Sequence, residues 1–336
     1  MTYRVLGRSG LQVSPLALGS MMFGGQTDAA TSQRIIHTAF EQGINFIDTA
    51  DVYNAGRAEE IVGQALAGRR DDWVLASKVG MGQADAGVNR RGLSRKHILS
   101  SIEGSLRRLG TDYLDIYYLH REDHDTPLDE SIAAIGDLLR QGKIRYWGLS
   151  NYRGWRIAEA VHVARELGVQ PPVVSQPLYN LVNRQAEAEQ IGAAAFHGLA
   201  LVPYSPLARG VLSGKYQPGV APDQDSRAGR QDKRILETEW RDESLHIAQR
   251  VRQHAEARGV GTVEFAIAWV LHNAAVAAAI VGPRTEEQWA VYQRALKVRI
   301  DGLDEAFVDG LVAPGHASTP GYNDPTHYVS GRPLRR

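Results

Sequence analysis

The amino-acid sequence predicts a (β/α)8 barrel, an α/β fold in which eight parallel strands alternate with helices. The chain of 336 residues is long enough for one such barrel, and we expect a single domain over residues 1–336. Short β-rich runs alternate with longer runs of helical period from end to end. Polar side chains end nearly every apolar run, on the side where a barrel carries its active site.

A doubly wound parallel sheet is the alternative fold, because it shows the same alternation. Such a sheet usually carries a G-x-G-x-x-G phosphate turn after its first strand. Here the first strand leads into GSMMFGG, which does not match. The sequence therefore favours the barrel.

The strands are expected after an N-terminal β-hairpin that turns at Arg8-Ser9-Gly10. Each candidate is a short β-rich run that ends close to a polar residue. The eight candidates are residues 15–19, 44–50, 74–79, 114–120, 145–150, 173–177, 200–205 and 277–282.

Helices fill the intervals between these strands. Helical period is clearest over residues 95–109, where Ser94 is the expected N-cap. A second helix is expected after Thr126, which can cap it, with Pro127 at the first helical position. A third spans residues 155–167.

Two long segments lack a periodic pattern. Residues 207–240 contain QPGVAPDQDSRAGRQDKR, and a loop this long in a compact domain is usually a functional lid or disordered. The tail from Gly315 is also irregular, and we expect it to lie over one end of the barrel. The most apolar window, residues 263–281, contains Glu264 and His272, so it predicts a core helix and a strand rather than a membrane span.

Composition excludes several classes of partner and chemistry. The 38 Lys and Arg residues balance 38 Asp and Glu residues, so nothing indicates a nucleic acid or an anionic membrane as partner. The absence of cysteine excludes disulfides, thiol nucleophiles and thiolate metal sites. The N-terminus lacks the pattern of a signal peptide, so we expect a cytoplasmic protein. The oligomeric state is not indicated.

Lys78 ends a buried strand, where an ammonium group without a partner costs several kcal/mol or loses its proton. Asp48, near the end of the preceding strand, is the natural carboxylate partner. Tyr53 follows Asp48 closely, and His120 ends the fourth strand. An inert salt bridge would satisfy Lys78 and Asp48, but it would not account for Tyr53 and His120 at the same rim.

Together these four side chains predict a site that protonates a carbonyl oxygen. An ammonium beside a tyrosine hydroxyl lowers the tyrosine pKa, so a Tyr53–Lys78–Asp48 relay is a tuned proton donor. His120 can hydrogen-bond the same substrate oxygen and orient it. No side chain supplies hydride, so a nicotinamide must.

The stretch HREDHD, residues 120–125, suggests a rival chemistry, because His and Asp at short spacing occur in metal hydrolases. The ends of the other strands offer no further ligand set. We therefore expect no metal.

The chain resembles the aldo-keto reductases from about Tyr3 to about Ala313. The matching stretches, in family order, are FIDTADVYNAGRAEEIVGQAL, VLASKVG, DYLDIYYLHRED, GKIRYWGLSNY and VPYSPLARGVLSGKY. The resemblance implies a (β/α)8 barrel capped by the N-terminal hairpin, with long loops at its C-terminal face, and NADP(H)-dependent carbonyl reduction. The chain is also similar to potassium-channel β-subunits, which share this fold.

The resemblance also implies roles for individual residues. The tetrad falls on Asp48, Tyr53, Lys78 and His120, with Tyr53 as the acid in reduction and the base in oxidation. The expected carboxamide contacts are Ser150, Asn151 and Gln176, and Tyr204 is expected to stack on the nicotinamide. Further cofactor contacts are expected at Gly19, Ser20, Met21, Asp48, Ser205, Pro206, Leu207, Arg209, Gly210, Lys215, Arg227, Gly282, Arg284 and Gln288.

The sequence departs from the family at the adenine end. The family usually places Glu and Asn there, and this chain has Val291 and Tyr292. Arg284 still offers a planar fork for a 2′-phosphate, so NADP(H) is favoured over NAD(H).

These observations predict an NADPH-dependent reductase of aldehydes or ketones. The alternatives are an NAD(P)-dependent sugar or alcohol dehydrogenase, which runs the same chemistry backwards, and a cofactor-binding regulatory subunit. The substrate pocket is expected to use Met22, Phe23, Tyr53, His120 and the 207–240 loop. An apolar wall around a polar centre suits many carbonyl compounds, so the sequence does not identify the substrate.

Overall fold

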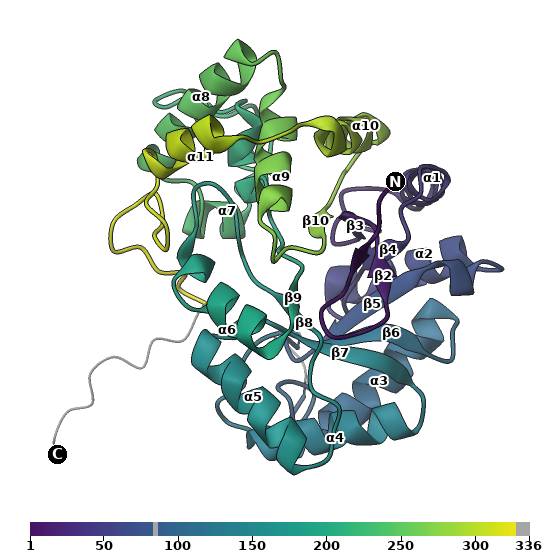
Figure 1. Cartoon of the computed structure of the whole chain (residues 1–336). Coiled ribbons are helices and arrows are strands. Elements are labelled where there is room, and N and C mark those ends of the chain that lie inside the picture. The colour runs from purple at the N-terminus through teal and green to yellow at the C-terminus, as the bar shows by residue number, and fades with distance from the viewer. Residues whose placement is uncertain (83–86, 327–336) are drawn as a thin grey trace, which may run out of the picture.

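The computed structural model describes residues 1–82 and 87–326 and confirms the predicted (β/α)8 barrel (Figure 1). Eight strands form one sheet in the order β10-β3-β4-β5-β6-β7-β8-β9, and each neighbouring pair is parallel. Leu201 N donates to Ala275 O at 2.9 Å, and Ile280 N donates to Pro203 O at 2.9 Å. These hydrogen bonds join the chain around β10 to the chain around β9 and close the sheet into a ring.

The elements have the following bounds. The strands are β1 (Arg4–Val5), β2 (Gln12–Val13), β3 (Leu16–Gly19), β4 (Phe46–Asp48), β5 (Val74–Val79), β6 (Leu114–Leu119), β7 (Ile144–Ser150), β8 (Val174–Gln176), β9 (Ala200–Leu201) and β10 (Ala279–Val281). The α-helices are α1 (Ala29–Glu41), α2 (Arg57–Leu66), α3 (Arg95–Leu109), α4 (Leu128–Arg140), α5 (Gly154–Glu166), α6 (Gln190–His197), α7 (Lys233–Glu237), α8 (Asp242–Ala257), α9 (Thr262–His272), α10 (Glu286–Arg294) and α11 (Gly302–Asp309). The 3-10 helices are η1 (Tyr53–Gly56), η2 (Arg70–Asp72), η3 (Gln185–Glu187), η4 (Ala208–Ser213) and η5 (Ala295–Lys297).

The predicted bounds hold where local signals are strong. Both β5 and α3 have the expected limits, and the Ser94 side chain caps α3 by accepting from His97 N. The predicted start of α4 is wrong: Pro127 is the N-cap, and the Thr126 hydroxyl donates to Asp123 Oδ2 at 2.7 Å instead of capping the helix.

Other predicted elements are corrected by a few residues. β9 ends at Leu201 rather than at residue 205, because Pro203 has no N–H for a ladder. The segment 207–240, expected to be irregular throughout, contains η4 and the short helix α7.

Strand alternation separates an inner core from an outer core. Val74 and Ala76 of β5 lie in the apolar cluster inside the barrel, whereas Leu75 and Val79 lie in the cluster between strands and helices. Because successive side chains of a strand point to opposite faces, Lys78 is the next inward-facing residue after Ala76. Alternation therefore places its ammonium group inside the barrel, near the carboxyl end.

The N-terminal hairpin of β1 and β2 covers the amino-terminal end of the barrel. Its two strands pair antiparallel, and Arg8 N donates to Gly198 O at 2.9 Å, just before β9. Gly7 has a φ of +56°, and a Cβ there would lie 2.3 Å from Val173 O. Only glycine fits this approach to the barrel backbone, so the turn is locked against the start of β8.

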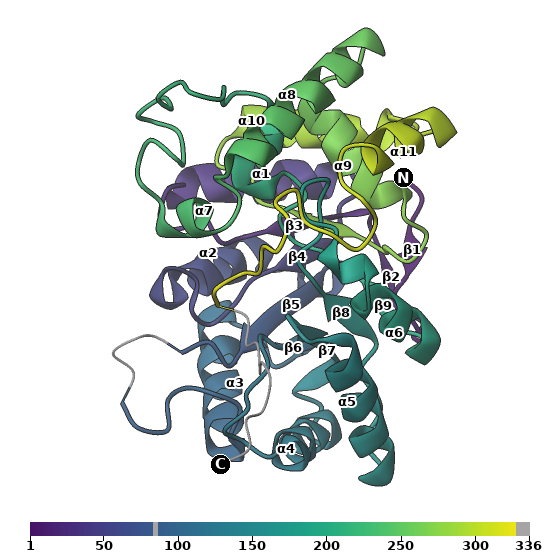
Figure 2. The same ribbon diagram turned by 90° about the vertical axis from the view of Figure 1, so that its left-hand side faces the viewer.

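The C-terminal segment 315–326 crosses the opposite end of the barrel, as expected. Arg184 N donates to His316 O at 2.8 Å, and Ser318 N donates to Val182 O at 2.9 Å. In Figure 2 this yellow segment passes in front of the barrel strands. Across residues 1–82 and 87–326, no helix has the length and apolar character needed to cross a membrane.

Candidate active site

Four ionisable side chains meet at the carboxyl end of the inner core. Asp48 is the last residue of β4, Lys78 lies in β5, and His120 directly follows β6. Tyr53 opens η1, in the loop after β4. Lys78 is fully buried and Asp48 is 2% exposed, so both charges depend on each other and on nearby dipoles.

The Lys78 ammonium group has three protons and three acceptors. Lys78 Nζ donates to Asp48 Oδ1, to Thr49 O at 2.8 Å and to Tyr53 Oη at 3.1 Å. Gln176 Nε2 holds the other Asp48 oxygen, Oδ2, at 2.9 Å. The arrangement leaves no Lys78 donor unused and fixes the Tyr53 hydroxyl beside a positive charge.

The electrostatics of Tyr53 and Lys78 follow from burial and from this contact. Burial disfavours the Lys78 ammonium, but the Asp48 and Tyr53 charges outweigh burial and raise the pKa of Lys78. Burial raises the pKa of Tyr53, and the Lys78 charge opposes that rise. The expectation of a lowered Tyr53 pKa is therefore wrong for the site as a whole, although Lys78 acts in the expected direction.

His120 is a neutral imidazole beside the tyrosine. Burial lowers the pKa of His120 well below its usual value, and the Lys78 and Arg121 charges lower it further. Its Nδ1 atom has no hydrogen-bond partner in the described part of the chain. The Tyr53 and His120 rings meet edge to face, with centroids 6.0 Å apart. The imidazole next to the Tyr53 ring therefore keeps one nitrogen without a partner in the described residues.

A strained turn holds Tyr53 in place. Asn54 and Ala55 have φ angles of 47° and 56°, and Gly56 follows with 90°. Left-handed backbone is costly for residues other than glycine, and such strain concentrates at functional sites. The Asn54 side chain supports the turn, because its Nδ2 donates to Met21 O at 3.0 Å and to Phe23 O at 2.7 Å.

These side chains border a cavity of about 450 Å³. The structure brings most of the predicted site residues to its wall. They are Gly19, Met21, Met22, Asp48, Tyr53, His120, Ser150, Asn151, Gln176, Tyr204, Ser205, Pro206, Leu207, Arg209, Gly210, Lys215, Arg227, Gly282, Arg284 and Gln288.

Three predicted residues lie outside this wall. Lys78 is buried behind Tyr53 and Asp48, where it acts through them. Ser20 is fully buried, and Phe23 is fully buried in the outer core between strands and helices. The placement of Phe23 in the substrate wall is therefore wrong, because the turn after β3 directs this ring away from the cavity.

The sequence prediction missed several residues of the wall. Those without an assigned role were Gln26, Met81, Arg121, Ile280, Val281, Tyr292 and Thr326, while Arg230 and Arg234 were included only as part of the 207–240 loop. Arg121 directly follows His120, so its position at a strand end was a usable signal. Thr326 had none, because its place depends on the long-range path of the tail.

Uncharged polar groups form a network at the expected carboxamide end. Ser150 Oγ donates to Gln176 O at 3.0 Å. Asn151 Nδ2 donates to His120 O at 2.9 Å, and Asn151 Oδ1 accepts from Tyr204 Oη at 2.8 Å. These bonds fix the amide and the Tyr204 ring relative to His120.

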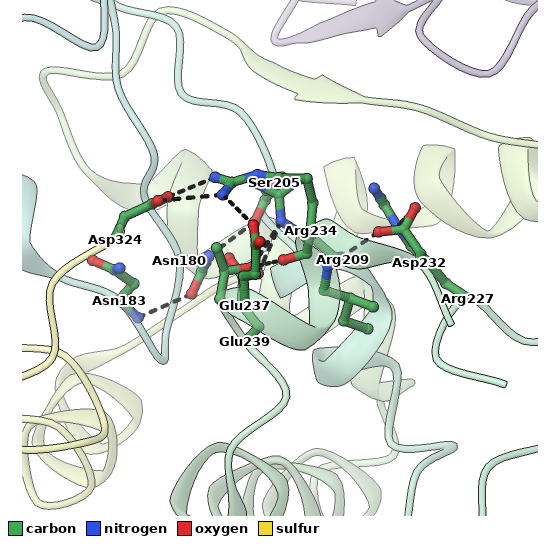
Figure 3. Close-up of polar contacts among 12 residues, drawn as sticks. Asn180, Asn183, Ser205, Arg209, Arg227, Asp232, Arg234, Glu237, Glu239 and Asp324 are labelled. Carbon is green, nitrogen blue, oxygen red and sulfur yellow. Dashed lines mark hydrogen bonds and ion pairs between the residues drawn. The ribbon is translucent and has the colours of Figure 1, made fainter. Parts of the chain in front are cut away.

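Basic side chains also line the cavity, and Figure 3 shows two of them, Arg209 and Arg227, with their acidic partners. Arg209 Nε lies 2.9 Å from Glu239 Oε2, and Arg227 Nε lies 3.1 Å from Asp232 Oδ2. By contrast, neither Lys215 nor Arg284 has a carboxylate partner within residues 1–82 and 87–326. These two cations are available to an anion.

The wall fits a nicotinamide dinucleotide. An aromatic ring and amide groups stand beside Tyr53, and cations without acidic partners stand farther along, as a molecule with a neutral ring and a charged phosphate portion requires. Gly210 has a φ of +102°, and a Cβ at Gly282 would meet only Gly19 O at 3.6 Å. Backbone can therefore approach a ligand closely at both glycines.

A second cavity of about 1230 Å³ adjoins the first. Arg121, Asn151 and Thr326 belong to both walls. In the described part of the chain, no group of three or more His, Asp or Glu residues could hold a metal ion. His124, from the stretch that suggested a hydrolase, lies 3.1 Å from Glu122 and forms no wider cluster of that kind.

Comparison with known proteins agrees with this geometry. The model of the Aldo/keto reductase family matches residues 15–311, which include Asp48, Tyr53, Lys78 and His120. A rice protein (Oryza sativa subsp. japonica) named "Probable voltage-gated potassium channel subunit beta" is 40% identical over 318 residues, covering 93% of this chain and 96% of its own. An Arabidopsis thaliana protein of the same name is 38% identical over 303 residues, covering 89% and 92%.

Proposed function

Because the chain belongs to the aldo/keto reductase family, we propose that it is an NADP(H)-dependent reductase of aldehydes and ketones. The observation that carries the proposal is the Lys78 ammonium, which binds both Asp48 and Tyr53 Oη at the edge of the cavity. A buried salt bridge alone would not need a tyrosine hydroxyl as third partner. The neutral His120 beside that hydroxyl supports the same reading.

The roles of the side chains follow from their positions. When bound, a reduced nicotinamide would supply the hydride for the carbonyl carbon. His120 donates a hydrogen bond that orients the carbonyl oxygen, and Tyr53 Oη gives this oxygen its proton. The Tyr53 phenolate that remains is stabilised by the Lys78 ammonium, which Asp48 keeps charged and in place. Oxidation of an alcohol reverses these proton transfers.

The cofactor contacts support NADP(H) over NAD(H). Arg284, which has no acidic partner in the described residues, offers a guanidinium for a 2′-phosphate. Gln288 Oε1 accepts from Arg284 N at 2.8 Å and holds this turn. We place Ser150, Asn151 and Gln176 at the carboxamide and Tyr204 on the nicotinamide ring. The adjoining larger cavity is the space proposed for the rest of the carbonyl substrate.

The proposal is tested by following NADPH absorbance with a panel of aldehydes, ketones and alcohols, in both directions. The wild-type protein should oxidise NADPH with at least some aldehydes, and Tyr53→Phe should bind NADPH normally but turn over about 10²- to 10⁴-fold more slowly. A protein that binds NADPH but reduces no carbonyl of the panel would contradict it. Faster turnover of alcohols than of carbonyls would instead favour a dehydrogenase.

A second candidate is a cofactor-binding subunit of a larger assembly. The names of the rice and Arabidopsis relatives, at 40% and 38% identity over most of both chains, favour it. The two roles predict different behaviour, because a subunit needs cofactor binding but not rapid turnover. NADPH affinity without appreciable turnover would favour the subunit.

A further inference from the structure

A second group of polar and ionisable residues, some fully and some partly buried, lies on the outer side of β5. Lys78 points into the barrel, so its neighbour Ser77 points outward. We call Asp51, Glu59, Ser77, Arg108 and Tyr117 the outer cluster. Its members come from the loop after β4, from α2, β5, α3 and β6. The mechanism proposed above uses none of them.

Glu59 is the satisfied acid of the outer cluster. It is fully buried, and its Oε1 accepts from Ser77 Oγ at 2.5 Å. Its Oε2 accepts from Arg108 Nε at 2.7 Å and lies 2.6 Å from Arg108 Nη2. The fork of the only cation in the cluster is therefore committed to Glu59.

Asp51 is the acid without such a partner. Its Oδ1 atom is buried and has no hydrogen-bond partner in the described part of the chain, and the same holds for Tyr117 Oη beside it. Asp51 is partly buried, and the Arg108 side chain, 30% exposed, is paired with Glu59 and not with Asp51. A second carboxylate near the first is therefore harder to ionise. Burial and the Glu59 charge raise the pKa of Asp51 to about 7, against the charges of Arg108 and Lys78 and a hydrogen bond from the Val52 amide.

Asp51 is linked to the active site through backbone and charge. Its N–H donates to Lys78 O at 3.4 Å, and it precedes Tyr53 by two positions in the same loop. A carboxylate two residues from Tyr53 in the same loop favours the protonated phenol, and its effect on the Tyr53 pKa adds to the larger effects of burial and of Asp48. The Lys78 charge lowers the pKa of both groups.

We propose that Asp51 is a positioning residue of the reductase proposed above, and that its buried carboxyl controls from behind the catalytic strand how readily Tyr53 releases its proton. The inference rests on the proposed role of Tyr53 as proton donor. With Asp51 protonated, Tyr53 donates to the carbonyl oxygen more readily. With Asp51 ionised, Tyr53 holds its proton more tightly, and reduction slows.

The first test is the pH profile of kcat for NADPH-dependent aldehyde reduction. The wild-type rate should fall about 3- to 10-fold between about pH 6 and pH 8, as one buried charge acts on a proton transfer. Asp51→Asn should abolish this fall, which is the alkaline limb of the profile, so its kcat should stay at the faster value at the higher pH. Asp51→Glu, which restores the carboxyl, should restore a limb, and removal of an exposed acid in Asp72→Asn should leave the wild-type profile unchanged.

The second test reads Tyr53 without any turnover. With ¹³Cζ-labelled tyrosine and Tyr53→Phe to assign the signal, the pKa of Tyr53 should be lower in Asp51→Asn than in the wild-type protein by about 0.5 or more. An unchanged pH limb together with an unchanged Tyr53 titration would overturn the proposal. Absence of any carbonyl reduction would instead count against the proposed function, while the tyrosine titration would still decide the role of Asp51. If Asp51→Asn does not fold, Asp51→Ser, which also lacks a carboxyl, makes the same comparison with the wild-type protein.

Discussion

At the scale of single residues, Lys78 is the centre of the site because its three donors are divided among three acceptors. One acceptor is a charge, one is the backbone and one is the proposed proton donor. Removing Lys78 therefore leaves Asp48 buried without its cation and Tyr53 without the charge that opposes its raised pKa. The tyrosine and the lysine should act as one unit.

This unity predicts non-additive mutants. Lys78→Met should lower kcat at least as far as Tyr53→Phe, because it detunes the donor and leaves Asp48 unpaired. The double mutant should be little slower than the slower single mutant, since residues that act together do not contribute independently. Single-turnover rates with saturating NADPH measure all three variants. Losses that multiply in the double mutant would show that the two side chains work separately.

Arg284 carries the prediction on cofactor choice. Arg284→Ala removes a guanidinium that has no acidic partner in the described residues. It should therefore weaken the binding of NADPH and leave the binding of NADH unchanged. Loss of a charge-assisted contact corresponds to roughly 10- to 150-fold in Kd, or about 1.5–3 kcal/mol. Titration with both cofactors provides the measurement, and NADH is the internal control. Equal weakening of both cofactors would contradict a 2′-phosphate contact.

Asp48, Lys78 and His120 could be predicted because they lie at or directly after strand ends, where alternation and fold fix the direction of a side chain. Lys78 faces inward because Val74 and Ala76 do. Phe23 and Asp51 lie in turns, where no period applies. The burial of Asp51 depends on α2, α3 and β6 closing around it, and a local pattern does not carry that information.

At the scale of elements, the 207–240 segment is held by ion pairs that bridge distant parts of the chain. Arg209 pairs with Glu239, and Arg234 Nη2 lies 2.7 Å from Asp324 Oδ2 of the C-terminal segment (Figure 3). Helix α3 and strand β5 could be predicted to the residue because caps and periodicity are local. The ion pairs could not, because they join residues far apart in sequence.

The same segment provides a test of cofactor docking. Arg230 and Lys233 are exposed to trypsin, and Arg230 lies on the cavity wall together with Lys215 and Arg227 of the same segment. NADPH bound against these wall residues should restrain the segment, and cleavage after Arg230 and Lys233 should therefore be slower. Time courses with and without NADPH measure the effect. In Arg284→Ala, protection should require more NADPH, and cleavage that ignores NADPH in the wild-type protein would count against this docking.

At the scale of the whole molecule, the active site is built at a cost in stability that depends on pH. The inner core ends in one charge pair, and the outer cluster adds a carboxyl without its own cation. The charge pair joins the ends of β4 and β5 inside the barrel, whereas Asp51 lies in the loop after β4. The ring of parallel strands and the N-terminal hairpin stabilise the barrel and offset the destabilising effect of these buried charged groups.

The last prediction concerns that pH dependence. Asp51 has a pKa of about 7 in the folded protein, and a pKa of about 3.9 is expected in the unfolded chain. Between these values the folded state binds more protons, so the free energy of unfolding falls as pH rises. In Asp51→Asn the residue does not titrate, so this loss is absent. The free energy of unfolding of Asp51→Asn, relative to that of the wild-type protein, should therefore rise from about pH 4 to pH 7 and then level off, at no more than roughly 4 kcal/mol.

Urea unfolding of both proteins across this range measures the difference, and Asp72→Asn, which removes an exposed acid, should show almost none. A difference in the free energy of unfolding that does not change with pH would mean that Asp51 titrates at its ordinary pKa. Because unfolding does not involve turnover, this experiment tests the raised pKa of Asp51 independently of the proposed reaction. A growing difference, together with a kcat limb that disappears in the same variant, would tie the cost in stability to the control of Tyr53.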